Sequence, residues 1–163
     1  MFMSLLYKLQ PVIYVQISPD LLTVRNVRSG QSISEVPEVA ITTGSKPKIV
    51  AVGAQAHSAV TPVVRLHNPF AHPRSLASDF HVAEQLLKAQ LLRVRKPSLI
   101  MLTPRVVIHP LGNPAGGFTQ IERRAFREMA LGAGASTVHV WTGRPLTDQE
   151  LLDPEFLEDH DRS

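Results

Sequence analysis

The first half of the chain carries short apolar runs that alternate with turn-forming residues. Runs of about four to eight apolar residues are typical of strands, and prolines and glycines between these runs favour turns. The turn signal at residues 18–20 predicts that the first two strands form a hairpin. Residues 54–78 hold three prolines and are predicted to be irregular. The strands predicted from this pattern are Val12–Ile17, Leu21–Val27, Val36–Thr42 and Lys48–Val52.

Apolar positions in the second half follow helical spacing. A helix is predicted over residues 119–131, where Thr119 and Glu122 have the spacing of a capping box. Gly132 and Gly134 follow it and are predicted to end it, because glycine tolerates positive φ. Three residues at steps of four are predicted to share one face of this helix: Ile121, Ala125 and Met129.

A second helix is predicted over residues 79–94, with Ser78 as its cap. The residues that give it helical spacing are Ala83, Leu86, Leu87, Leu91 and Val94. Thr147 and Glu150 repeat the capping-box spacing and predict a short helix from Thr147 to Leu152. The last residues, 158–163, are expected to be frayed.

Two more apolar runs, at residues 105–109 and 138–141, flank the helix predicted at 119–131. A strand, a helix and a strand in this order are typical of a crossover between parallel strands. Together with the hairpin nearer the N-terminus, the order predicts an α/β fold with a mixed sheet.

Composition narrows the class of protein. The chain has 163 residues, of which 44% are hydrophobic, and this favours one domain with a sizeable core. It has no cysteine, which excludes disulfides and thiol chemistry and favours a cytoplasmic location. No apolar stretch is long enough to predict a transmembrane helix, and no secretory signal is expected.

Charge is distributed unevenly along the chain. Residues 1–147 carry sixteen basic and seven acidic side chains, a net charge of +9, whereas residues 148–161 hold the other seven acids. The body should therefore prefer anionic surfaces, and the acidic tail could compete for the same face. Solvated surface charge explains the same pattern equally well.

The histidines and the glycine-rich loop are the residues that could suggest a metal site or a phosphate site. Three histidines cluster at His67, His72 and His81, but two prolines keep them off one shared helix and no cysteine or paired carboxylate completes a zinc site, so no metal is expected. His109 and His139 are predicted to form a hydrogen-bonded pair in the core. The glycine-rich loop at 111–117 lacks the lysine and serine or threonine of a phosphate-binding loop and is predicted to be a surface turn.

Nuclease activity and nucleic-acid binding are not expected. A two-metal nuclease needs clustered carboxylates, and the first strand offers Gln16 instead. Arg123, Arg124 and Arg127 form a basic stripe, but aromatic residues for base stacking are not interleaved with it. A solvated or partner-facing helix is the simpler interpretation of these arginines.

Four segments together resemble one family. They are Thr119–Ala135 with Pro104–Ile108 before it, Val36–Ile41, Ala51–Gly53, and Ala77–Phe80 followed by Val82 and Glu84. This chain resembles MreB, the bacterial actin-like protein that determines rod shape, over roughly residues 12–145. The resemblance reaches only the first half of the family fold and implies an actin-like, ribonuclease-H-like half with a central sheet and a smaller outer lobe.

The chain departs from the family at the residues that handle nucleotide. The family's first phosphate loop reads Asp-Leu-Gly-Thr, and the matching positions here are Gln16, Ile17, Ser18 and Pro19. Gln16 offers no carboxylate for Mg²⁺, Ser18 lacks the freedom of glycine, and Pro19 has no N–H to donate. The family also places a glutamate before a proline after the last strand, where this chain has Arg144, or Gly143 with a different gap.

The resemblance therefore implies a non-catalytic, pseudo-ATPase half-domain that needs no cofactor. We expect it to act by protein association with an MreB-type filament or another cell-shape protein, with homo-oligomers as a further option. The alternative is a minimal ATPase completed by dimerisation or by a second chain. The expected organisation is an amphipathic segment at 1–11, the actin-like half at 12–146 with an outer lobe at about 48–95, and an acidic tail at 147–163.

Membrane contact is a further expectation. Residues 1–8 are apolar enough for a short amphipathic anchor, with Phe2, Leu5 and Leu6 as contact residues. Some family members insert an apolar dipeptide from the loop before the Pro-Arg-Val strand, and Met101 and Leu102 stand near that position. The chain is thus expected in the cytoplasm, at the inner membrane face. The opposing interpretation is that residues 99–102 extend a buried strand and that the N-terminus is packed or disordered.

Overall fold

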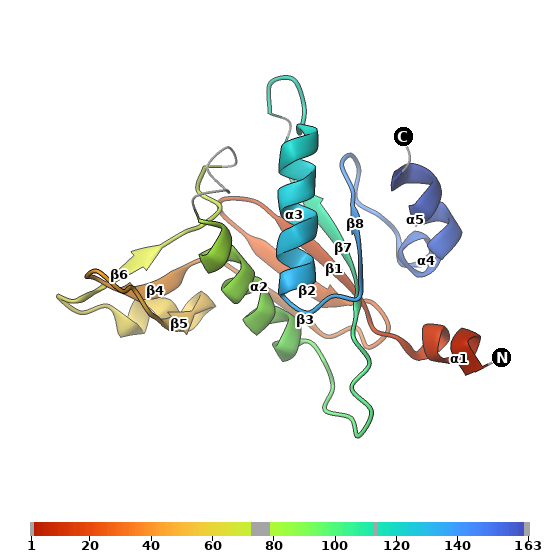
Figure 1. Cartoon of the computed structure of the whole chain (residues 1–163), viewed down its shortest axis with the longest axis horizontal. Coiled ribbons are helices and arrows are strands. Elements are labelled where there is room, and N and C mark those ends of the chain that lie inside the picture. The colour runs from red at the N-terminus through yellow and green to blue at the C-terminus, as the bar shows by residue number, and fades with distance from the viewer. Residues whose placement is uncertain (1, 73–78, 113, 162–163) are drawn as a thin grey trace.

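The computed structural model describes residues 2–72, 79–112 and 114–161, and it is built around a five-stranded sheet with the strand order β3-β2-β1-β7-β8 (Figure 1). Strands β1, β2 and β3 form an antiparallel meander, whereas β1, β7 and β8 run parallel. The strands are β1 (Val12–Ile17), β2 (Leu22–Asn26), β3 (Ser32–Glu35), β7 (Arg105–Pro110) and β8 (Thr137–Val140). This order makes the fold a mixed α/β sheet, as the sequence predicted.

Helix α3 (Gln120–Gly132) crosses from β7 to β8 and covers one face of the sheet beside α2 (Phe80–Arg93) (Figure 1). The crossover and the capping box between Thr119 and Glu122 are confirmed, and Gly134 adopts the positive φ of 111° that was expected after the helix. Gly132, which was also predicted to follow the helix, is instead its last residue. The residues predicted to pack on α2 are all buried: Ala83, Leu86, Leu87, Leu91 and Val94.

The predicted face of α3 is wrong in part. Ile121 is 82% exposed, and the buried residues of the helix are Phe126, Met129 and Ala130. Steps of four residues drift around a helix that has 3.6 residues per turn, so the stripe through Ile121 leaves the sheet by the first turn. The N-cap predicted for α2, Ser78, lies outside the described residues, and Asp79 stands at the cap position without a side-chain cap bond.

The opposite face of the sheet is covered by the C-terminal segment. Helices α4 (Asp148–Leu152) and α5 (Pro154–Asp161) bury Leu151 and Leu157 against the sheet, in a cluster with Val12, Tyr14 and Val107. The capping box of α4 is confirmed. The frayed end predicted from residue 158 is wrong as far as Asp161, because Leu157 is buried against the sheet and Phe156 packs beside it, and these contacts hold α5 in place.

A second, three-stranded antiparallel sheet has the order β5-β4-β6 and forms the smaller lobe at the left of Figure 1. Its elements are β4 (Val39–Thr42), β5 (Ile49–Val52), the 3₁₀ helix η1 (Gly53–Ala59) and β6 (Val64–His67). The strand predicted over Val36–Thr42 is confirmed from Val39, where β4 begins, but its predicted start at Val36 is wrong, because residues 36–38 connect β3 of one sheet to β4 of the other and include Pro37. The irregular segment predicted from residue 54 contains η1 and β6.

Glu35 ties the two sheets together. Its carboxylate accepts hydrogen bonds from Arg93 and Gln90 on α2 at 3.0 and 3.1 Å and from the Ala54 backbone N–H at 3.3 Å. Gly53 has a φ of 64°, and a Cβ there would lie 1.8 Å from the Glu35 Oε2. Glycine is therefore required at position 53 for this contact to form.

Candidate functional site

The turn between β1 and β2 occupies the place that the resemblance gives to a phosphate loop. The Ser18 N–H donates to the Leu21 carbonyl at 3.0 Å, and the Leu21 N–H donates to the Ser18 Oγ at 2.9 Å. Pro19 has no N–H, and its carbonyl accepts from the Asn68 Nδ2 at 2.7 Å. The backbone donors of Ser18 and Leu21 are thus used inside the turn, where a phosphate would need them.

The surroundings of this turn are apolar. Ser18 and Pro19 line a small cavity at the ends of β1 and β7, and Phe118 meets Phe126 edge to face there at a centroid distance of 6.2 Å. The other residues that line this cavity are Ile17, Phe70, Pro110 and Leu111. Phosphate oxygens and a hydrated Mg²⁺ need polar partners, so burying them among these side chains would be costly.

Gln16 stands where the resemblance places the Mg²⁺-positioning aspartate of the phosphate loop. It is partly buried in β1 and pairs in register with Thr23 of β2 and His109 of β7. A neutral amide cannot replace the carboxylate that positions Mg²⁺ in the related phosphate loop. Gln16, Ser18 and Pro19 are therefore together at the end of β1, and they do not fit a Mg²⁺-nucleotide.

A buried polar network lies beside Gln16, on the face of the sheet that helices α4 and α5 cover. The Leu146 N–H donates to the Tyr14 Oη at 3.3 Å, and Tyr14 lies 2.6 Å from the His109 Nδ1. The His109 Nε2 lies 3.0 Å from the Gly143 carbonyl, which can only accept. The ring is therefore protonated on Nε2, and its Nδ1 accepts from Tyr14.

Burial favours the neutral forms of both rings. It lowers the pKa of the His109 imidazole below its ordinary value of 6.5, with the Gly143 carbonyl opposing the shift. It raises the pKa of the Tyr14 phenol. The predicted pair of His109 with His139 is wrong, because both ring nitrogens of His109 meet other partners and His139 stands opposite Val107 in the sheet.

Arg144 is separate from the turn residues and does not line their cavity. It forms a two-pronged ion pair with Glu150 of α4, with N–O distances of 2.5 and 2.9 Å. This contact holds the pKa of Glu150 at about 2. The Trp141 Nε1 donates to the Arg144 carbonyl at 2.8 Å, so the segment after β8 is fixed to α4. Arg144 offers no base for activating water.

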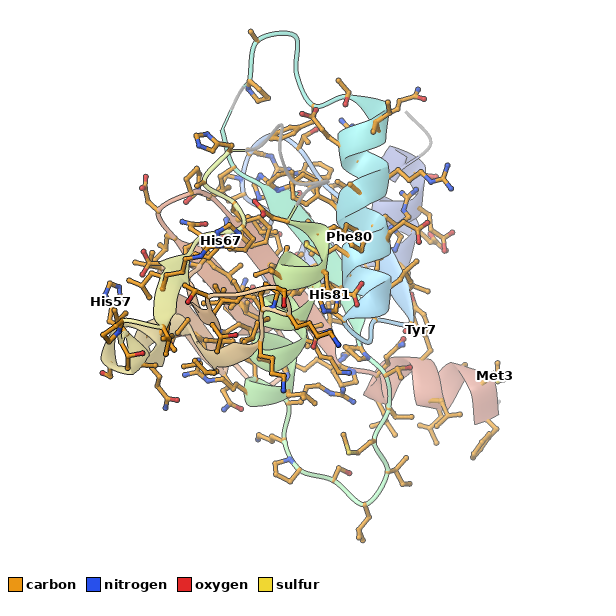
Figure 2. The ribbon with its side chains drawn as sticks, turned by 60° about the vertical axis from the view of Figure 1, so that its left-hand side comes forward. Met3, Tyr7, His57, His67, Phe80 and His81 are labelled. Carbon is orange, nitrogen blue, oxygen red and sulfur yellow. The ribbon has the colours of Figure 1, made fainter. Side chains whose placement is uncertain are left out.

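His67, one of the three histidines considered for a metal, contacts a carboxylate instead, as does His57 on the small lobe. His67 meets Asp79 at 2.9 Å, and His57 meets Glu38 at 2.5 Å. Figure 2 shows His57 at the outer end of the small lobe, far from His81 on α2. Within residues 2–72, 79–112 and 114–161 there is no group of three or more residues that could hold a metal ion.

The second candidate site is a surface formed by α1 (Phe2–Leu9) and the loop 94–104. Helix α1 buries none of its residues, and Figure 2 shows it standing out from the body of the protein. In the loop, Leu99, Ile100 and Met101 are exposed, so the alternative of a buried strand extension is wrong. No helix among the described residues is long and apolar enough to cross a membrane.

The structure brings the two segments of this surface together. A groove of about 470 Å³ runs between them, with Leu6 on one side and Met101 and Leu102 on the other. Phe2 and Leu5 are exposed on the same helix. The five residues singled out for membrane contact thus lie on two neighbouring elements, although they are distant in the sequence.

Helix α1 is attached to the body by a few polar contacts. Arg105 is 2% exposed, hydrogen-bonds the Tyr7 hydroxyl, and lies 5.0 Å from the centre of the Tyr7 ring. The Gln10 amide donates to the Thr103 carbonyl at 2.8 Å, just after the helix. In Figure 2, Tyr7 lies on the part of α1 nearest the body and Met3 lies farther out.

The sheet order and the crossover helix define an actin-like half-domain, a class that comparison with solved structures supports. The crystal structure of MreB5 of Spiroplasma citri bound to ADP aligns with a TM-score of 0.59 and 20% identity, over 83% of this chain and 39% of that one. The same protein bound to AMPPNP aligns with a TM-score of 0.55 and 19% identity, over 82% and 38% of the two chains.

Sequence comparison gives the family. The MreB/Mbl protein family model matches residues 20–145, and the chain therefore belongs to the MreB/Mbl family. It is 32% identical over 125 residues to the cell shape-determining protein MreB of Pasteurella multocida, covering 75% of this chain and 30% of that protein. It is 40% identical over 63 residues to MreB of Haemophilus influenzae, covering 39% and 17%. The chain thus spans less than a third of the length of these curated relatives.

Sequence reasoning missed two strands and the Tyr14 network. Strand β3 alternates exposed and partly buried residues, and this period of two was a usable signal at Ser32–Glu35. At Val64–His67 the alternation of apolar and polar residues gave a weaker signal for strand β6. The bond between Tyr14 and His109 spans 95 positions, and no local pattern encodes it.

Proposed function

We propose that this chain works by protein association in a cell-shape assembly and does not hydrolyse ATP. Its membership of the MreB/Mbl family supplies the cell-shape context. The absence of ATP hydrolysis is proposed from the turn at Ser18 and Pro19. The N–H groups of Ser18 and Leu21 bond within this turn, and its surroundings are apolar. An ATPase of this fold needs that turn to cradle phosphate.

The proposal rests on residues that are present in the chain. Rebuilding a phosphate loop would require a carboxylate at Gln16, release of the hydrogen bonds between Ser18 and Leu21, and a donor in place of Pro19. It would also require polar atoms where Phe118 and Phe126 now pack. These changes are too many for a small shift of the backbone to supply.

Calorimetry with ATP and Mg²⁺ tests the non-catalytic part. We expect no measurable heat of binding for the chain alone. The variant carrying Gln16→Asp, Ser18→Gly and Pro19→Thr restores the polar groups of the loop and should still fail to bind, because the apolar wall remains. Tight Mg²⁺-dependent binding by the unmodified chain would contradict the proposal and favour the alternative of a minimal ATPase.

Co-sedimentation tests the association. The chain is mixed with polymerised MreB from a relative such as that of Pasteurella multocida, and the pellet is compared with a control without polymer. We expect the chain to enter the pellet or to change the amount of polymer formed. A chain that does neither would contradict the assembly role, whatever the calorimetry gives.

We further propose that this association takes place at the inner membrane face of the cytoplasm. The support is the surface of α1 and the loop 94–104, where Phe2, Met3, Leu99 and Ile100 are each at least 69% exposed. Exposed apolar side chains on two adjoining elements are typical of a surface that meets a partner or lipid. Flotation with lipid vesicles tests this part, and a chain that stays with the soluble fraction for every lipid would contradict it.

A further inference from the structure

A groove lies between the small lobe and the first turns of α2, the helix nearest that lobe in Figure 1. Its volume of about 540 Å³ falls in the range of about 300 to 1,000 Å³ that is typical of ligand pockets, and such pockets are common between lobes. The groove shares no residue with the turn at Ser18 or with the groove beside α1. The residues that line it are Ile41, Pro47, Lys48 and Ile49 of the small lobe and His81, Val82 and Gln85 of α2.

The apolar wall from the small lobe depends on an irregularity in its sheet. The register of β4 and β5 shifts after Ala40, so that Ile41 lies opposite Ile49 and Val50 is the extra residue of a bulge. Opposite residues of an antiparallel pair lie on the same face, and both isoleucines line the groove. Val50 is 52% exposed. In a regular ladder Ile49 would face the other way, so the bulge turns its side chain into the groove.

Three polar side chains reach the groove from its two sides. Lys48 comes from the small lobe, whereas His81 and Gln85 are four positions apart and share one face of α2. None of these three side chains takes part in a hydrogen bond or an ion pair within residues 2–72, 79–112 and 114–161. Ammonium, imidazole and amide groups all carry N–H donors, so together they suit an anionic group such as a carboxylate.

No carboxylate of the described residues lines the groove. Residues 39–78, which supply its wall from the small lobe, contain no Asp or Glu. The two acids in the first turns of α2 have other neighbours: Asp79 lies 2.9 Å from His67, and the Glu84 carboxylate lies against Gly132 of α3. The charge of Lys48 therefore has no counter-charge in the groove, and an anionic ligand supplies one.

Contacts on either side of the groove keep its walls in place. At the start of α2, Asp79 pairs with His67 of β6 at 2.9 Å. Toward the end of the helix, Gln90 and Arg93 bond at 3.1 and 3.0 Å to Glu35, the residue that joins the two sheets. The part of α2 that lines the groove lies between these two contacts, so the walls are spaced before any ligand arrives. A pre-formed site loses less conformational freedom on binding.

We propose that this groove binds a small organic carboxylate with an apolar body. The carboxylate lies at Lys48 and Gln85, and the apolar body lies against Ile49 and Val82. An inorganic anion leaves these aliphatic walls in contact with water, and a neutral apolar molecule leaves the lysine without a counter-charge. A molecule that joins both groups satisfies both sides of the groove. This binding site is independent of the protein association proposed above.

An NMR titration of the full ¹⁵N-labelled chain tests the site with three probes. The first, 2-naphthoate, carries a carboxylate on an apolar ring system; 2-naphthamide has the same shape without the charge, and acetate has the charge without the rings. We expect 2-naphthoate to shift the amide signals of residues 48, 49, 82 and 85 and to bind about tenfold more tightly than 2-naphthamide, because hydrogen bonds to a charged group are stronger. Acetate at the same concentration should leave these signals nearly unchanged.

Two lysines of one hairpin give a matched pair of variants. Lys48→Gln removes the cation of the groove and should weaken the binding of 2-naphthoate about tenfold, while 2-naphthamide binds as before. Lys46→Gln removes the same charge from a residue that does not line the groove and should weaken binding less than about twofold. Both lysines are exposed, so neither variant should change the melting temperature. Gln85→Trp fills the groove from α2 and should abolish the binding of both ring probes.

Each contrary result has a distinct meaning. Equal losses in Lys48→Gln and Lys46→Gln would overturn the site, as would the largest signal shifts falling outside the groove. Equal binding of the two ring probes would overturn the carboxylate, and equal effects of acetate and 2-naphthoate would overturn the apolar body. Shifts of the groove signals when the chain alone is concentrated would assign the groove to a second copy of the chain and overturn the ligand.

Discussion

The two regions singled out in this protein treat their apolar side chains in opposite ways. At the turn between β1 and β2, Phe70 and Phe126 are buried in the wall of a small cavity that Ser18 and Pro19 also line. On α1 and the loop 94–104, side chains of similar size such as Phe2 and Leu99 face solvent. The first arrangement stabilises the fold by burying apolar area, whereas the second contributes little stability and leaves apolar side chains exposed to solvent.

The largest effect expected from this contrast is on stability. Phe126→Ala should lower the free energy of unfolding by about 3 to 5 kcal/mol, because it leaves a cavity in the core beside the turn. Leu99→Ala removes a comparable apolar group from a fully exposed position and should change stability by less than about 0.5 kcal/mol. Urea denaturation followed by circular dichroism measures both, and similar losses in the two variants would erase the contrast.

A smaller loss is expected from the polar network next to the turn. Tyr14→Phe leaves the Leu146 N–H and the His109 Nδ1 without partners in the interior and should cost about 1 to 3 kcal/mol. The double variant Tyr14→Phe with His109→Phe should cost less than the sum of its two parts, since both partners of the bond are gone. Strict additivity in the same denaturation experiment would show that the two rings are not coupled.

The pH dependence of stability gives a third test. The folded pKa of His109 lies below its unfolded value, so the unfolded chain binds the proton more readily and stability rises with pH in this window. The contribution should be complete above about pH 6.5 and decline as the pH falls below it, by at most about 1.4 kcal/mol per pH unit. Unfolding measured between about pH 5 and 7 should show this slope, and His109→Phe should flatten it. An unchanged slope in that variant would assign the effect to other groups.

The smallest effect on stability is expected at the exposed surface. Leu99→Ser with Ile100→Ser should leave the free energy of unfolding within about 0.5 kcal/mol of the unmodified chain. The same variant should weaken vesicle binding about tenfold or more, because apolar area that enters the lipid interface is lost. Val63→Ser, at a position 63% exposed on the small lobe, serves as the control and should keep vesicle binding. Equal losses in the two variants would place the membrane contact elsewhere.

Local patterns predicted those parts of the fold that local physics governs. The two capping boxes, at Thr119 and Thr147, depend on side chains three residues apart, and both form. The apolar run Val12–Ile17 predicted a buried strand, and its side chains are buried alternately on the two faces of the sheet. The hairpin after it follows from the turn residues between the strands.

Long-range contacts set the limits of prediction. The Leu146 N–H reaches the Tyr14 hydroxyl across 132 positions, and nothing near either residue indicates it. The frayed end expected at the C-terminus became α5 because Leu157 finds an apolar face on the sheet. In the same way, the groove beside α1 exists only because the loop 94–104 folds next to a helix some ninety residues earlier in the chain.

Residue type and local spacing were enough to predict the mixed α/β class and the crossover helix, and they leave residue 16 without a carboxylate and residue 19 without an N–H donor. The folded chain was needed to show that the Leu21 N–H bonds to the Ser18 Oγ within the turn and that aromatic rings line the cavity beside it. It also brings Lys48 and the first turns of α2 to one groove. Burial and the meeting of distant side chains are properties of the packed chain, and no local segment carries them.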